Sequence, residues 1–110
     1  MNKDSENEYV IIFNTCPGSI TAKQIAQDLV ANSLAACVNV IPSIKSYFKW
    51  GNQIKNETEY LLIIKTRREN YPAIEKKIQS LHPYELPEVI AVPITDGSRG
   101  YLDWINQFTK

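Results

Sequence analysis

Residues 57–66 have the sequence ETEYLLIIKT, which is the strongest strand signal in the chain. Its centre, Tyr60–Ile64, is apolar at consecutive positions. Successive side chains of a strand point to opposite faces of a sheet, so a run of this kind predicts a strand whose two faces are both covered. The sequence on either side must therefore supply helices for one face and a second covering for the other.

Three amphipathic helices are predicted around this strand, because apolar residues recur there at three- and four-residue spacing. The first follows Thr21, which with Gln24 would form a capping box. The second is ended by Pro83, and the third follows the break at Asp96-Gly97. In chain order, the three apolar faces are Ala22, Ile25, Ala26, Leu29 and Val30; Tyr71, Ile74, Ile78 and Leu81; and Tyr101, Trp104, Ile105 and Phe108.

Three further segments predict strands. Glu8–Asn14 and Val89–Ile94 are short, apolar and rich in branched side chains, and Ala36–Ile41 is similar. The third of these is expected to stop at Pro42, whose missing N–H cannot serve a central ladder. A hairpin arm with aromatic side chains is expected to turn at Gly51-Asn52, a pair suited to a two-residue loop.

The order of these elements predicts a ferredoxin-like α+β sandwich. It consists of two strand-helix-strand halves, βαββαβ, with an extended hairpin and a C-terminal helix added. We expect residues 1–8 to be a polar tail and residues 9–110 to be a single domain. The uncovered face of the sheet and the aromatics Tyr47, Phe48 and Trp50 indicate a homo-oligomer, because large apolar surfaces are covered by partners.

Composition narrows the function classes. The chain has 110 residues, of which 44% are hydrophobic, and it has 12 basic and 12 acidic side chains. This balance gives no reason to expect nucleic acid or an anionic membrane surface as a partner. The longest apolar run, Tyr60–Ile64, is far below the roughly 20 residues of a membrane helix, so we expect a cytoplasmic protein with reduced cysteines.

Four residues are candidates for metal binding. His82 is the single histidine, and neutral imidazole is a favoured ligand of copper and zinc. Cys16 would suit Cu(I) as a thiolate, and Glu85 and Glu88 offer oxygen ligands, although Pro83 and Pro87 make their segment extended. A weakly bound copper or other divalent ion is therefore expected, with no organic cofactor. The alternative is structural: His82 ends a helix and Cys16 sits in a turn.

A second candidate site is a small-ligand cleft between subunits. Lys65, Tyr84 and Glu88 could supply the few convergent polar groups that such a pocket needs. The aromatic lining would come from Tyr47, Trp50, Tyr101 and Trp104. The alternatives are that these aromatics are interface and core residues and that Glu88 pairs with Lys65 or Arg99.

The chain carries no nucleophile elbow and no phosphate-binding glycine loop, and its carboxylates form no pair in a recognisable catalytic context. An enzymatic function is therefore not expected. Cys37 follows an apolar segment and is interpreted as core packing.

Several motifs together resemble the CutA1 divalent-cation tolerance family. They are HPYELPE at 82–88, VPI at 92–94, Tyr101-Leu102 with Trp104, LAACVN at 34–39 and SYFKW at 46–50. The resemblance implies a ferredoxin-like protomer assembled into a homotrimer by strand pairing, with a role in metal tolerance. The alternative is a PII-like signalling or adaptor trimer that binds a small ligand or protein.

The sequence departs from the family pattern at two positions. Copper-linked members of the family carry a cysteine two positions before Cys16 and a histidine before His82, where this chain has Asn14 and Leu81. From that ligand set, the resemblance carries over His82 alone.

Overall fold

The computed structural model describes residues 8–110, so the predicted polar tail lies outside the described residues except for Glu8. The elements in chain order are β1 (Tyr9–Cys16), α2 (Ser19–Ala31), β2 (Cys37–Trp50), β3 (Gln53–Arg67), the 3-10 turn η1 (Arg68–Asn70), α3 (Tyr71–Leu81), β4 (Ile90–Pro93) and α4 (Arg99–Gln107). Each expected helix and strand is therefore present. Every helix among these residues is too short or too polar to cross a lipid bilayer.

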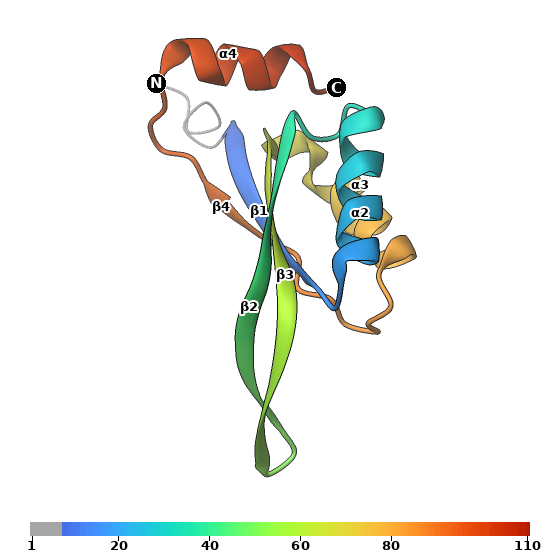
Figure 1. The fold of residues 1–110 in the computed structure, drawn as a ribbon. Coiled ribbons are helices and arrows are strands. Elements are labelled where there is room, and N and C mark those ends of the chain that lie inside the picture. The colour runs from blue at the N-terminus through green and yellow to red at the C-terminus, as the bar shows by residue number, and fades with distance from the viewer. Residues whose placement is uncertain (1–7) are drawn as a thin grey trace.

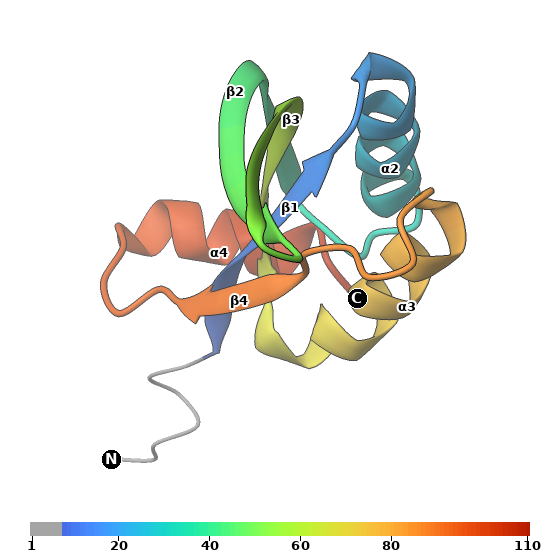
Figure 2. The ribbon, with the colours of Figure 1, turned by 90° about the horizontal axis from the view of Figure 1, so that it is seen from below.

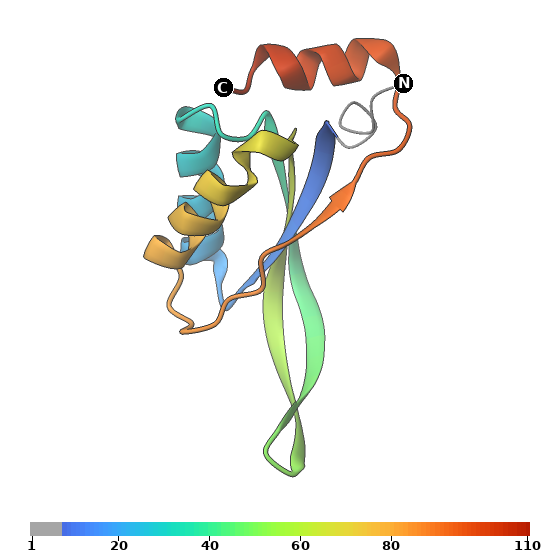
Figure 3. The ribbon, with the colours of Figure 1, turned by 180° about the vertical axis from the view of Figure 1, so that it is seen from behind.

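The four strands form one antiparallel sheet in the order β2-β3-β1-β4. Helices α2 and α3 lie side by side on one face of it (Figures 1 and 3). This order, with both crossover helices on one face, is the ferredoxin-like arrangement, so the predicted fold class is confirmed. The edges of the sheet are β2 and β4, and among residues 8–110 each has one side without a strand partner.

The core lies between the sheet and these two helices. Alternate residues of β1 are buried, as the two-residue period of a strand requires, and the same alternation runs along the second half of β3. Each large side chain removed from water there contributes roughly 1.5–3 kcal/mol. The fully buried apolar side chains of the core are Ile12, Ile25, Leu29, Leu62, Ile64, Ile74 and Ile78.

The predicted end of the second strand at Pro42 is wrong. Strand β2 continues through this proline to Trp50, with a shift of register between Ile41 and Ile44 and a positive φ of 60° at Ser43. Strand β2 is an edge strand, and prolines are tolerated at edges and at bulges because no central ladder loses a hydrogen bond there. The proline therefore marks a bulge.

The predicted capping box at Thr21 is also wrong. Helix α2 begins at Ser19 with Gly18 at the N-cap position, no side chain caps it, and the N–H of Ala22 donates to Gly18 O at 3.2 Å. Asn70 occupies the N-cap position of α3, and its amide donates to Thr66 Oγ1 at 3.3 Å. The cap pattern at Thr21 thus indicates where α2 lies but not how its first turn is hydrogen-bonded.

Strands β2 and β3 run beyond β1 and β4 as a two-stranded ribbon (Figure 1). The turn at Gly51-Asn52 joins them as predicted, and Gly51 has the positive φ of 62° that a glycine adopts without strain. Side chains such as Trp50 and Ile54 are 69% and 77% exposed on this ribbon. Helix α4 crosses the sheet end where β1 begins, on the side away from α2 and α3 (Figure 2).

Candidate functional site

A polar cluster lies where β1 ends; four of its five residues are buried, and Tyr84 is 38% exposed. It joins Asn14 and Cys16 of β1, Glu59 of β3, and His82 and Tyr84 of the segment that follows α3; we call these five residues the Cys16 cluster. The antiparallel pairing of Cys16 with Tyr60 places the end of β1 beside Glu59. The structure therefore brings together two of the metal candidates selected from the sequence, His82 and Cys16, with Tyr84 of the predicted ligand cleft.

Both ring nitrogens of His82 are engaged. The Nδ1 atom lies 3.1 Å from the backbone N–H of Tyr84, which can only donate, so Nδ1 accepts. The Nε2 atom then carries the hydrogen and donates to the carbonyl oxygen of Thr15 at 2.7 Å. With 7% of its surface exposed, this imidazole is a neutral connector between β1 and the segment after α3. A metal ion would have to displace one of these hydrogen bonds.

Cys16 is completely buried, and its Sγ donates to Asn14 Oδ1 at 3.1 Å. The amide of Asn14 in turn donates to the backbone oxygen of Glu88 at 2.8 Å. Burial, together with the nearby carboxylate of Glu59, raises the pKa of the Cys16 thiol to about 12. Near neutral pH the residue is therefore a thiol and a poor nucleophile, because the thiolate is the reactive and metal-binding form.

Glu59 is a buried carboxylate that the sequence analysis missed. Only 6% of its surface is exposed, and the hydroxyl of Tyr84 donates to its Oε2 at 3.1 Å. Burial and this hydrogen bond raise the pKa of Tyr84 to about 12. The ring of Tyr84 also packs 4.7 Å from the ring of His82. The available signal was the presence of an acidic residue in the strongest strand, since glutamate is depleted in strands.

The remaining metal candidates do not join the cluster through their side chains. Glu85 and Glu88 are exposed, and Glu88 contributes its backbone oxygen alone. Within residues 8–110, no three His, Cys, Asp or Glu side chains are grouped closely enough to hold a metal ion. Within the same residues, no ion pair joins Glu88 to Lys65 or Arg99.

The residues of the predicted ligand cleft lie in three separate places in the protomer. Tyr84 belongs to the Cys16 cluster, whereas the Lys65 ammonium lies 5.6 Å from the ring centre of Tyr101 on α4. Trp104 packs on Tyr101 with ring centres 5.4 Å apart. Tyr47 and Trp50 are on the ribbon, 70% and 69% exposed. A single protomer does not assemble this cleft, so the intersubunit cleft stays a prediction.

Comparison with known proteins gives the family. Residues 10–108 match the family described as CutA1 divalent ion tolerance protein. The chain belongs to this family. It is 45% identical over 98 residues to the mouse protein named Protein CutA, and 39% identical over 101 residues to the Arabidopsis thaliana protein named Protein CutA, chloroplastic. These matches cover 89% and 92% of this chain.

Solved CutA structures share the fold. The Thermus thermophilus structure described as divalent cation tolerance protein (Cut A1) superposes with a TM-score of 0.90 at 37% identity, covering 93% of this chain and 99% of that one. The match spans only 55% of the mouse CutA protein and 56% of the Arabidopsis protein. The chain therefore corresponds to a whole bacterial CutA1 protomer and to about half of these two longer relatives.

Proposed function

We propose that the protein takes part in the tolerance of divalent cations and that it does so without enzymatic activity. The observation that carries this proposal is the match to the CutA1 family over residues 10–108. The Thermus thermophilus relative, which has the same fold over nearly its whole length, is named for this tolerance. The thiol of Cys16, the one buried thiol of the cluster, has a pKa of about 12, which disfavours its use as a catalytic nucleophile.

The working unit in this proposal is a homotrimer joined by strand pairing. Two observations support it. Edge strands β2 and β4 each have one side unpaired in the protomer, and unpaired edges are templates for another chain. Aromatic side chains of the ribbon, Tyr47 and Trp50 among them, are largely exposed. Large exposed apolar patches are characteristic of association surfaces.

The proposed cargo is copper or another divalent ion, bound modestly, and His82 would be its first ligand. Binding at the ring of His82 requires the loss of the bond to Thr15 or to the Tyr84 N–H, each about 0.5–1.5 kcal/mol. Binding at Cys16 requires deprotonation of a thiol whose pKa is about 12. Glu85 and Glu88 are exposed and would complete a site as oxygen ligands. The lost hydrogen bond of His82 and the deprotonation of Cys16 both cost free energy, so we expect the ion to be bound weakly.

Native mass spectrometry of the reduced protein, titrated with copper, tests the assembly and the cargo together. A trimer that takes up one ion per subunit is expected, and His82→Ala and Cys16→Ser should reduce that uptake. Cys37→Ser is the matched control, because Cys37 is only half-buried and lies outside the Cys16 cluster. A trimer that stays free of metal at micromolar copper, or equal uptake by the His82→Ala variant, would contradict the proposed ion site.

The cytoplasmic location expected from the sequence stays a prediction, since the Arabidopsis relative is named chloroplastic. The PII-like signalling alternative also stays a prediction, because no contact in the protomer joins Lys65, Tyr84 and Glu88 within the part of the chain that the structure describes.

A further inference from the structure

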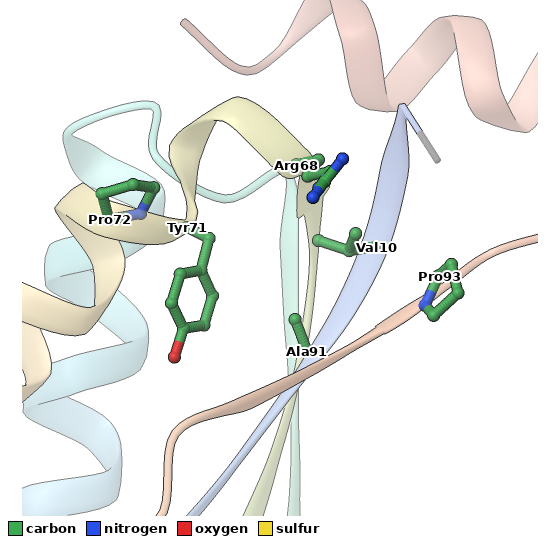
Figure 4. Close-up of a pocket in the computed structure, with 6 residues that line it drawn as sticks. All are labelled: Val10, Arg68, Tyr71, Pro72, Ala91 and Pro93. Atoms are coloured by element: carbon green, nitrogen blue, oxygen red, sulfur yellow. The ribbon is translucent and has the colours of Figure 1, made fainter. Parts of the chain in front are cut away.

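A cavity of about 500 Å³ separates the strand pair β1 and β4 from the start of α3 (Figure 4). No residue of the Cys16 cluster lines it. Figure 4 shows strand residues on one side and helix residues on the other, with Arg68 of η1 above Val10. The lining residues are Val10, Arg68, Tyr71, Pro72, Ala91 and Pro93.

Most of the residues that line this cavity are apolar, and Tyr71 is held in place. The hydroxyl of Tyr71 lies 2.8 Å from Val89 O and 3.0 Å from Glu75 Oε2, so the outer end of the tyrosine ring is anchored. Opposite it, Val10 pairs with Pro93 across the β1–β4 ladder. Proline rings and an anchored aromatic ring lose little freedom on binding, so the cavity is already formed for a flat apolar group.

Arg68 gives the cavity its charge. Its backbone N–H donates to Glu8 O at 2.7 Å, which fixes the start of its side chain beside β1. The neighbouring Glu69 is paired with Arg67 instead. Within residues 8–110, the guanidinium of Arg68 has no ion pair, and the first turn of α3 carries no acidic side chain. A guanidinium that has no ion pair among residues 8–110 and lines a cavity beside apolar residues attracts an anionic group.

We propose that this cavity binds a small planar organic acid. The carboxylate pairs with the guanidinium of Arg68, whose forked geometry matches a carboxylate through two parallel hydrogen bonds. The ring of the ligand lies between Tyr71 and the strand residues Val10 and Ala91. Glu75 sets the orientation, because its carboxylate at the hydroxyl end of Tyr71 repels a second anion there. The volume is within the range of small-molecule sites, about 300–1,000 Å³.

Titration with sodium benzoate, followed by ¹H–¹⁵N correlation spectra of the whole protein, tests the proposal. The amide signals of Arg68, Tyr71 and Ala91 should shift in a saturable way. Arg68→Gln should weaken binding about tenfold or more, because a charge-assisted pair is lost. Arg99→Gln is the matched control, since Arg99 begins α4 and does not line the cavity, and it should leave the affinity unchanged.

Two further measurements separate the contribution of the ligand's charge to binding from that of the apolar wall. Benzamide, which has the shape of benzoate without its charge, should bind as weakly as benzoate binds to Arg68→Gln. Ala91→Leu, at an exposed position of β4, should fill the cavity and abolish binding while the rest of the spectrum is retained. No saturable shift at millimolar benzoate, equal affinity of the wild type and Arg68→Gln, or shifts centred on other residues would overturn the proposal. Copper binding is not involved in any of these outcomes.

Discussion

The two halves of β3 show how one strand behaves in two environments. From Tyr60 to Arg67 it runs through the middle of the sheet, between β1 and β2, and alternate side chains are buried against α2 and α3. From Gln53 to Thr58 it pairs with β2 alone, and both of its faces are exposed. Each half carries an isoleucine, but Ile64 is completely buried and Ile54 is 77% exposed.

This difference indicates where the stability of each half comes from. The buried half is stabilised within the protomer by helices of the same chain. An isolated two-stranded ribbon is marginal in water, so its apolar side chains need a further partner. In the proposed trimer that partner is another subunit, which makes the order of the ribbon dependent on assembly.

The largest expected effect comes from truncating the matched isoleucines. Ile64→Ala should lower the free energy of unfolding by about 2–5 kcal/mol, because it leaves a cavity in a packed core. Ile54→Ala should cost about 0.5 kcal/mol or less in the dissociated protomer. Urea unfolding at several protein concentrations measures both. Equal losses for the two variants in the dissociated protomer would contradict the contrast between the two halves of β3.

The second prediction concerns assembly through the ribbon. Replacing Tyr47 and Trp50 together by serine should weaken the trimer by about 2 kcal/mol or more, because interface aromatics often dominate association. Size-exclusion chromatography with light scattering should then show dissociation at concentrations where the wild type stays assembled. Ile20→Ser is the control, since Ile20 is 83% exposed on α2 and lies outside the ribbon. A double variant that keeps the mass of the wild type would show that the ribbon is not the interface.

The third prediction tests the polar contact nearest the boundary between the two halves. Tyr84→Phe should lower the free energy of unfolding by about 1–3 kcal/mol, because the buried carboxylate of Glu59 loses its hydroxyl donor. Adding Glu59→Gln should recover part of this loss by removing the charge. Thermal unfolding measures all three proteins. If Tyr84→Phe is as stable as the wild type, the hydrogen bond to Glu59 contributes nothing.

The fourth prediction concerns the pH dependence of the Cys16 cluster. Folding raises the pKa of Cys16 from 9.0, and that of Tyr84 from 10.0, in both cases to about 12. The folded chain thus keeps protons that the unfolded chain releases, so this contribution to stability is complete below about pH 9 and is lost as the pH rises toward 12. Unfolding measured from pH 8 to 11 should show this decline. Cys16→Ser should reduce the slope and Cys37→Ser should not; equal slopes in both variants would contradict the assignment.

Much of the fold follows from local patterns. The apolar run Tyr60–Ile64, the helical spacing of apolar residues and the glycine at position 51 each indicate one structure, because side-chain periodicity and backbone freedom act over a few residues. The prediction that Pro42 ends a strand is wrong because it considers only the local sequence. Whether a proline ends a strand depends on its neighbours in the sheet, and the edge position of β2 comes from the order of strands that are distant in sequence.

The candidate site was less predictable. His82 and Cys16 stand out as the single histidine and a thiol at a strand end, yet the availability of each for a metal depends on partners elsewhere in the chain. Thr15 and the Tyr84 N–H occupy the imidazole, and Glu59 raises the pKa of the thiol. Glu59 was not predicted as a site residue, because neither the burial of its carboxylate nor its hydrogen bond with Tyr84 can be inferred from its position in a strand.

Helices, strands, their order and the family can be recognised from the amino-acid sequence, because periodicity, turn chemistry and motifs are local properties of the chain. Which polar groups meet depends on the three-dimensional packing. The burial of Cys16, Glu59 and His82 and the meeting of Arg68 with Tyr71 around one cavity both arise from pairing between distant strands and from the packing of α3. Desolvation and hydrogen-bond partners are properties of a site in three dimensions, and they set the chemistry that each side chain can perform.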